Sequence, residues 1–277
     1  MPPPALFFWA RGHQGLPSTC TGTKTYLIRG SGGSASPSLE LLRREDQMAG
    51  RRTTLGDWHE AHGARFVEEG QWEIPGSYSS VAGEYDALRN TAGIIDACHH
   101  GRFKITGRDR ARAVNYLVTV NLENLPVNHQ TECYLCNDRG GIVDQVRVFK
   151  SDQFFLITSH GMSRQSVLNW LADQVMEQEF DAEVADSSGP QGSVTIMGPM
   201  SRTVLEGSIL DGSIPPGENS AGIVQIGQAR ALIISRKFAG IQSFTINAGS
   251  LYIQSVWERL YNVGSKMGVL PIGTEAL

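Results

Sequence analysis

The stretch CNDRGGIVDQVRVF, from Cys136 to Phe149, predicts a β-hairpin. Its NDRGG segment has the polar and glycine residues that are typical of a tight turn between two strands. After the turn, strand alternation puts Asp144 on an otherwise apolar face, and Gln145 and Arg147 on the opposite, mixed face. From the residues alone, the mixed face is expected to point to solvent, and a pocket wall is the alternative.

Periodic segments on both sides of this hairpin predict further strands and helices. Gly101–Gly107 alternates as a half-buried strand does, and Ser163–Met176 has the spacing of an amphipathic helix with Ser163 as its N-cap. Gly198, followed by a proline, indicates a tight strand–helix turn with too few glycines to hold a phosphate. The hairpins between helices indicate an α+β fold of antiparallel sheets with flanking helices. The other predicted helices span 79–90, 109–118, 200–205 and 250–264, and the other predicted strands span 132–135, 142–149, 154–158, 183–185, 192–197, 224–226, 231–235 and 244–246.

The composition is that of an ordinary globular protein: 277 residues, 40% hydrophobic and 19% charged. A net charge of -4 gives no reason to expect nucleic acid or an anionic membrane as a partner. The apolar runs are too short to span a bilayer. Four cysteines in a chain of this length do not indicate a disulfide scaffold, so a reducing compartment is expected.

Residues 1–47 differ from the rest, because they are rich in Pro, Gly and Ser and contain no acidic residue before Glu40. Such a segment is predicted to be a disordered extension, which leaves residues 48–277 as the folded region. Three explanations stay open: a transit peptide, a flexible arm, or a start codon placed too far upstream. The last of these is favoured and would make Met48 the first residue.

Two groups of residues could suggest a metal, and neither leads us to predict one. Cys133 and Cys136 have C-x-x-C spacing, but on a strand their side chains point to opposite faces and cannot share an ion. His59 and His62 share a helix face without a carboxylate at a recognised spacing, so packing or capping is expected.

Several motifs in order resemble the glycine cleavage system T-protein, the aminomethyltransferase family. The opening of the family is similar to TTLGDWHEAHGARFVEEGQWEIPGSY, and its next motif is similar to LRNTAGIIDACHHGRFKITG. Its N-E-x-G-G-I-I-D-D motif is similar to LCNDRGGIVDQVRVF, and its G-P motif is similar to IMGPMSRTVL. The resemblance covers residues 53–205.

The resemblance implies a fold of three α+β leaves around a channel that binds tetrahydrofolate. Residues 48–277 would supply two leaves of the folate-binding region, incomplete at the C-terminus and without the C-terminal barrel domain. The implied activity, part of glycine catabolism and one-carbon metabolism, is transfer of an aminomethyl group from a lipoyl-bearing carrier protein to tetrahydrofolate. The alternatives are a catalytically impaired folate-binding or interaction domain and a related folate-dependent demethylase. The expected location is the cytoplasm, or the mitochondrial matrix if the extension is a transit peptide.

The resemblance also assigns site residues. Gln145 stands where the family has its working aspartate, and it carries no charge and cannot take a proton at neutral pH. Asp144 is the neighbouring catalytic candidate, although its side chain is expected on the other face of the strand. His160 stands where the family has Asn. The positions implied to bind the cofactor are His100, Glu132, Gln145, His160, Phe238 (Tyr in the family) and Thr245 (Glu in the family).

Overall fold

The computed structural model describes residues 27–29 and 50–277 of the chain. Nearly all of the predicted extension, residues 1–47, therefore lies outside the described residues. Its described triplet forms strand β1 (Leu27–Arg29), whose backbone pairs with strand β10 (Glu183–Asp186). For these three residues the expectation of disorder was wrong, because a sheet edge offers backbone hydrogen bonds that need no apolar side chain.

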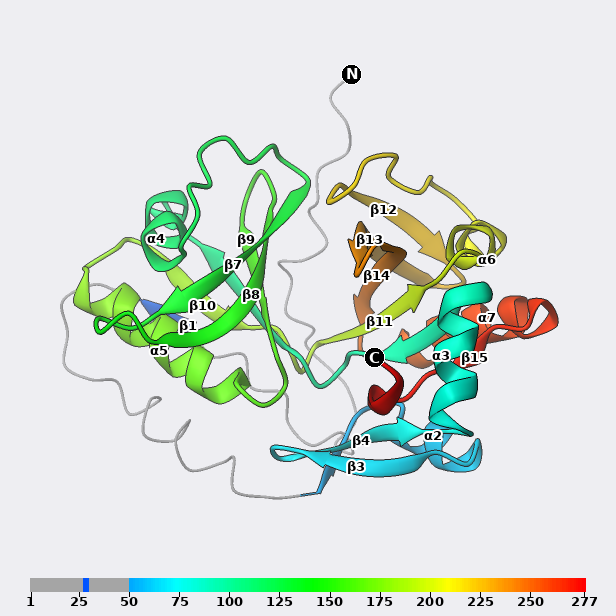
Figure 1. Ribbon diagram of the computed structural model, residues 1–277. Coiled ribbons are helices and arrows are strands. Elements are labelled where there is room, and N and C mark those ends of the chain that lie inside the picture. Colours follow the sequence, from blue (N-terminus) through cyan, green and yellow to red (C-terminus); the bar gives the residue numbers. More distant parts are fainter. Residues whose placement is uncertain (1–26, 30–49) are drawn as a thin grey trace, which may run out of the picture.

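The first six-stranded sheet, in the left half of Figure 1, has the strand order β1-β10-β6-β9-β8-β7. All its pairings are antiparallel, and the predicted hairpin is its β7–β8 pair. Helices α4 and α5 supply apolar residues to the core of this sheet, among them Val114, Leu168 and Leu171. The remaining elements are β6 (Gly101–Thr106), β7 (His129–Cys136), β8 (Ile142–Lys150), β9 (Phe155–Ser159), α4 (Arg110–Leu117) and α5 (Arg164–Glu177).

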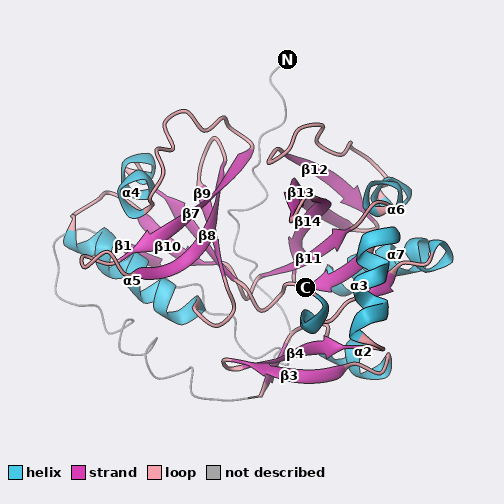
Figure 2. Ribbon diagram, viewed as in Figure 1, coloured by secondary structure: helices cyan, strands magenta, loops and turns pink. Residues whose placement is uncertain are grey.

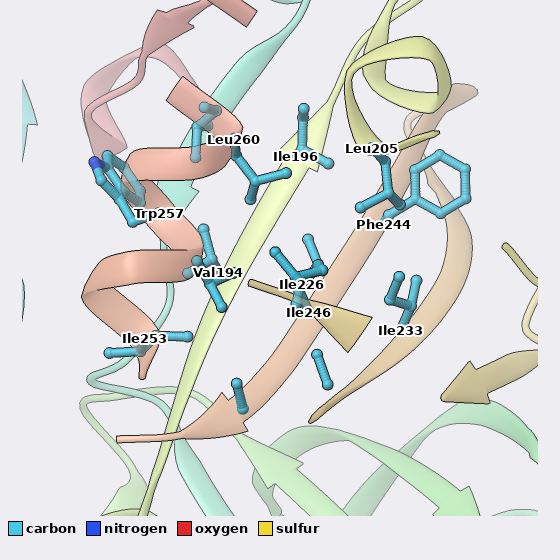
Figure 3. Close-up of a cluster of buried hydrophobic side chains, with 14 of the residues drawn as sticks. Val194, Ile196, Leu205, Ile226, Ile233, Phe244, Ile246, Ile253, Trp257 and Leu260 are labelled. Carbon is cyan, nitrogen blue, oxygen red and sulfur yellow. The ribbon is translucent and has the colours of Figure 1, made fainter. Parts of the chain in front are cut away.

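The second six-stranded sheet, in the right half of Figure 1, has the order β12-β13-β14-β11-β5-β15. Helices α6 and α7 pack on it, and Figure 3 shows Leu205, Trp257 and Leu260 meeting the strand residues in one apolar cluster. Burial of these side chains is the main force that joins helix to sheet. The elements are β5 (Gly93–Asp96), β11 (Gln191–Met197), β12 (Ala221–Ile226), β13 (Ala229–Phe238), β14 (Ile241–Gly249), β15 (Leu270–Pro271), α6 (Ser201–Ser208) and α7 (Ile253–Gly264).

A small third sheet of order β2-β4-β3 lies at the bottom of Figures 1 and 2. The C-terminal 3-10 helix η3 packs on this sheet, and the hydroxyl of Thr274 donates to the carbonyl of Pro75 on β4, at 3.4 Å. Just before η3, the backbone N–H of Gly273 donates to the buried carboxylate of Glu84 on helix α3. The elements here are β2 (Arg51–Arg52), β3 (Arg65–Glu69), β4 (Trp72–Ser77), α2 (Gly56–Ala61), α3 (Val81–Asn90), η2 (Ser265–Met267) and η3 (Thr274–Ala276).

The chain crosses between the two large sheets twice, through residues 97–100 and residues 187–190, and one buried side chain holds both crossings. The guanidinium of Arg102 donates to the carbonyls of Ala97 and Cys98 on the first crossing, at 3.2 and 2.9 Å. It also donates to the carbonyls of Ser188 and Gln191 at the second, at 2.9 and 2.8 Å. Arg102 is fully buried. Its hydrogen bonds therefore fix the two sheets relative to each other.

The α+β prediction with antiparallel sheets and flanking helices is confirmed. Strands β2, β4, β5 and β15 were not predicted. Ser163 does begin helix α5, but its side chain does not cap the helix and donates instead to the carbonyl of His160. None of the helices in the described part of the chain is both long and apolar enough to cross a membrane.

Candidate functional site

A cavity of about 540 Å³ lies between the two six-stranded sheets, and we call it the intersheet cavity. Strands β7, β8 and β9 of the first sheet and strands β5, β11 and β13 of the second supply its walls. Glu69 at the end of β3, the first crossing between the sheets, and Thr274 and Leu277 in the C-terminal segment complete it. Five of the residues implied to bind a cofactor line it: His100, Glu132, Gln145, His160 and Phe238.

The side chains of β8 lie on the two faces that the sequence predicts, but the mixed face contributes to the wall of the cavity. Gln145 and Arg147 line the intersheet cavity, so the expectation of a solvent face was wrong. The second sheet supplies a mixed polar and apolar wall across the cavity from this face, and no pattern local to the hairpin reveals that wall. Asp144 points the other way and is buried, with 8% of its side chain exposed. Gln145 is therefore the only one of the Asp144–Gln145 pair that lines the cavity.

Two arginines and one glutamate form a charged cluster in the cavity wall. Glu132 lies opposite Arg147 in the β7–β8 register, yet its carboxylate accepts a hydrogen bond from Nη1 of Arg236, at 3.1 Å. Burial, and to a smaller extent repulsion from Arg236, lowers the pKa of Arg147 to about 10. Among the described residues, Arg147 has no hydrogen bond or ion pair, and Nε of Arg236 is buried without a partner. The cluster thus carries more positive than negative charge, and it suits an anionic group.

The other carboxylates that line the cavity are also engaged. Oε1 of Glu69 lies 3.6 Å from Nε2 of His99, and the hydrogen bond from His99 outweighs burial and lowers the pKa of Glu69. Asp96 is buried and accepts hydrogen bonds from Nε2 of His59 at 3.0 Å and from the hydroxyl of Thr53 at 2.5 Å. None of the described Asp and Glu side chains in the cavity wall is therefore free to act as an unpaired base.

His100 and His160, which lie side by side in the cavity wall, differ in their surroundings. Burial, together with the charges of His99 and Arg147, holds the pKa of His100 well below its usual range, so its ring stays neutral. His160 lies beside it, with ring centroids 6.1 Å apart, and its side chain is 58% exposed. Nδ1 of His160 lies 2.9 Å from Oδ1 of Asp144, and its backbone N–H donates to Oδ2 at 3.0 Å. Asp144 thus contributes to the site through His160.

Phe238 and Thr245 have different places. Phe238 lies at the end of β13 with 42% of its surface exposed, and the guanidinium of Arg236 lies 5.5 Å from its ring centroid. Thr245 does not line the cavity; its hydroxyl contacts that of Thr195 at 3.3 Å, and Thr195 is the lining residue. Thr245 therefore lies one strand away from the residue of β11 that lines the cavity.

The remaining candidates have structural roles. His59 is buried against Asp96 and Tyr78, and His62 stacks on Trp58 with 3.6 Å between ring centroids, as expected for packing residues. Cys133 is buried in the core of the first sheet, and burial raises its pKa to about 12. The described residues contain no group of three or more His, Cys, Asp or Glu that could hold a metal.

Glu69, His99 and Arg236 are among the lining residues that were not singled out from the sequence. Arg236 lies two residues before Phe238, a position named from the resemblance, so its place in the sequence was an available signal. Glu69 ends strand β3, 60 residues before the start of β7, and nothing local marks it, because only the tertiary fold brings it to the cavity.

The comparisons with known proteins agree with this geometry. Residues 55–277 match the family model described as the GCVT N-terminal domain, which confirms the resemblance seen in the sequence. Similar curated proteins include the aminomethyltransferases of Alkaliphilus oremlandii and Thermoanaerobacter pseudethanolicus, 27% and 25% identical over 228 residues. Each alignment covers 82% of this chain and 61% of the relative, so the chain spans about 61% of their length.

Two solved structures share the fold. The crystal structure of glycine cleavage system aminomethyltransferase T from Bartonella henselae has a TM-score of 0.73 at 21% identity, over 82% of this chain and 60% of that one. The heterotetrameric sarcosine oxidase from Corynebacterium sp. U-96 has a TM-score of 0.51 at 16% identity, over 78% of this chain and 95% of that one. At these identities the likeness is one of fold.

Proposed function

The chain belongs to the GCVT N-terminal domain family, and from this membership we propose that its intersheet cavity binds a reduced folate and serves one-carbon transfer of the aminomethyltransferase type. The observation that carries the proposal is that five of the six positions that the resemblance assigns to the cofactor line one cavity. Four of them lie on or beside the first sheet and Phe238 lies on the second, so the fold brings together positions from residue 100 to residue 238. A ligand bound in this cavity could contact all five.

The residues present fit a folate. A volume of about 540 Å³ is within the range of cavities that hold ligands of this size, roughly 300–1,000 Å³. The exposed ring of Phe238 offers a surface for stacking a flat heterocycle. Arg147 and Lys237 offer cations to the glutamate carboxylates, and the Gln145 amide can both donate and accept hydrogen bonds.

In the proposed reaction, an aminomethyl group on a lipoyl sulfur of a carrier protein passes to tetrahydrofolate. The products are methylene-tetrahydrofolate, ammonia and the free thiol, which balances the atoms. When bound, the folate supplies the two nitrogens that take up the carbon. The protein binds and orients the reactants, excludes water from the cavity and handles protons.

A second candidate, a folate-binding domain with impaired transfer, is favoured by one observation. Gln145 lines the cavity where the family resemblance implies a carboxylate, and the lining carboxylates Glu69, Asp96 and Glu132 are each paired with a basic side chain. Loss of one preorganised charged group typically costs on the order of 10²–10³ in rate. Binding would then survive while transfer became slow.

Calorimetric titration of the full chain with 5-formyltetrahydrofolate, a stable reduced folate, tests the binding proposal. We expect one molecule to bind, and Phe238→Ala to weaken binding about threefold to tenfold through lost stacking. Tyr252→Ala is the matched control, because Tyr252 is also 42% exposed but does not line the cavity. Absence of binding to the wild-type chain would overturn the proposal.

A further inference from the structure

The pairing of Asp144 with His160 gives the cavity a feature that the resemblance does not assign. The carboxylate of Asp144 is buried and reaches the cavity only through the imidazole of His160, which lines it. Oδ1 of Asp144 lies 2.9 Å from Nδ1 of His160, and Oδ2 accepts the backbone N–H of the same residue at 3.0 Å. Both the ring and its backbone are therefore held by one side chain.

This arrangement selects one tautomer of the imidazole. A carboxylate at Nδ1 favours a proton on that nitrogen, so Nε2 becomes the atom with a free lone pair in the neutral ring. Among the described residues, Nε2 of His160 has no hydrogen-bond partner, and the side chain is 58% exposed toward the cavity. The ring is thus oriented by a buried acid on one side and open to a ligand on the other, which is the geometry of a general acid–base.

The groups around His160 shift the pKa of its ring upward. The hydrogen bond that His160 donates to Asp144 raises the pKa of His160 more than burial lowers it, and the charge of Glu69 adds to the increase while Arg147 opposes it. Burial would raise the pKa of Asp144, but the hydrogen bonds from the ring and the backbone N–H of His160 help to outweigh it and lower that pKa, so the carboxylate stays charged. His100, the neighbouring ring, stays neutral and does not compete for the proton.

We propose that Asp144 and His160 form a proton-transfer dyad facing the intersheet cavity, in which His160 exchanges a proton with an amine nitrogen of the bound ligand and Asp144 positions it. Neutral His160 takes the proton that an amine N–H loses on forming a bond to carbon. The resulting imidazolium gives that proton to the departing amine, so the dyad ends as it began. The inference rests on the proposed function for the identity of the amine. It assigns to His160 the proton chemistry that Gln145 cannot perform.

The first test needs no ligand. Histidine side-chain NMR of the full chain should give His160 a titration midpoint above that of a free imidazole, and Asp144→Asn should move this midpoint down. His160→Asn assigns the signal, and it keeps the backbone N–H that Asp144 binds, so the local fold is retained. Equal midpoints in the wild type and Asp144→Asn would overturn the dyad, because an acid with a purely structural role would not move them.

The second test is the proton change on ligand binding. Calorimetry with 5-formyltetrahydrofolate in buffers of different ionisation enthalpy should show a proton change in the wild type that is lost in His160→Asn. His129→Asn is the matched control, because His129 does not line the cavity. A proton change that is the same in wild type and His160→Asn would overturn the dyad even though folate binds. Absence of binding in the wild type would instead overturn the proposed function, and the NMR midpoints would still decide the dyad.

Discussion

Glu132 on β7 and Arg236 on β13 form an ion pair that joins the two large sheets across the intersheet cavity, with 3.1 Å between Oε1 and Nη1. The glutamate is 51% exposed and the arginine 13% exposed, so the cation is the more desolvated partner. Arg147 lies opposite Glu132 in the sheet register but forms no ion pair with it, so the carboxylate pairs with Arg236 and leaves the guanidinium of Arg147 available. The affinity of the cavity for anions therefore depends on this carboxylate.

Glu132→Gln should tighten binding of an anionic folate. The change frees Arg236 and removes a negative charge from the wall, and we expect about fivefold tighter binding at low salt, equivalent to roughly 1 kcal/mol. Calorimetry at two salt concentrations checks this, since the gain should shrink as salt rises. Glu206→Gln, which breaks the exposed pair with Arg202 on α6, is the control and should have little effect, because neither residue lines the cavity. Weaker binding in Glu132→Gln would show that the glutamate itself contacts the ligand.

Gln145→Asp should raise the rate of aminomethyl transfer. The new carboxylate would face the cavity beside Arg147, and a preorganised charge at such a position is worth up to about 10²–10³ in rate. Formation of methylene-tetrahydrofolate from an aminomethylated lipoyl carrier measures it. Gln145→Asn introduces a side chain of the same size as aspartate but without its charge, so it should not raise the rate. If the rate in Gln145→Asp stays that of the wild type, the missing charge is not the limiting defect.

Arg102→Met should destabilise the protein strongly. It leaves four buried carbonyls at the two crossings without their donor, and burial already lowers the pKa of Arg102 to about 10. We expect a loss of about 3–5 kcal/mol in the free energy of unfolding, measured with urea. Arg108→Met breaks only an exposed pair with Asp181 and should leave the unfolding midpoint unchanged. Similar midpoints for the two variants would mean that the carbonyls find other donors.

The sequence predicted the elements well because most of them are periodic and local. The β7–β8 hairpin follows from its turn residues, in which the Asn137 side chain accepts hydrogen bonds from the backbone N–H groups of Arg139 and Gly141. Strand β5 was not predicted because Gly93–Asp96 is buried throughout and shows no alternation.

The candidate site was predicted only where a motif marked it. Gln145, His160 and Phe238 were named from the resemblance, and each lines the cavity. The direction of Arg147 into a cavity depends on the second sheet, and the link from Glu69 to His99 joins residues on separate elements. Such contacts are set by tertiary packing, so residue patterns within one segment contain no record of them.

Asp96→Asn should reduce the acid dependence of stability. Burial alone would raise the pKa of Asp96, but hydrogen bonds from His59, Thr53 and Cys98 hold it at about 2, below the value near 3.8 of a free carboxyl. The ionised form therefore stabilises the fold by about 2 kcal/mol above pH 4, and this contribution is lost as the pH falls from 4 toward 2. Urea unfolding of both proteins at pH 7, 4 and 3 checks it. An unchanged pH slope in the variant would contradict the prediction.

Gly198→Ala should destabilise the turn between β11 and α6. Gly198 has φ of +132°, and an added Cβ would meet the backbone of Thr91 and Ala92. We expect a loss of about 2–4 kcal/mol, since strain and overlap act together. Gly227→Ala separates the two effects, because Gly227 has φ of +56° with open space around it and should cost only about 1 kcal/mol. Equal losses of stability in the two variants would show that the structure relaxes around the Cβ added at position 198.

The two crossings held by Arg102 make the segment from β6 to β10, which holds every strand of the first sheet except β1, an insertion within the second sheet. The chain leaves the second sheet after β5 and returns to it at β11, and the ends of the inserted segment lie side by side, since Phe103 pairs with Asp186. Because the ends of the inserted segment are adjacent, the segment can be removed or exchanged without changing the connectivity of the second sheet. One wall of the cavity can therefore diversify by replacement of a single continuous stretch of the gene, while the opposite wall keeps its sequence.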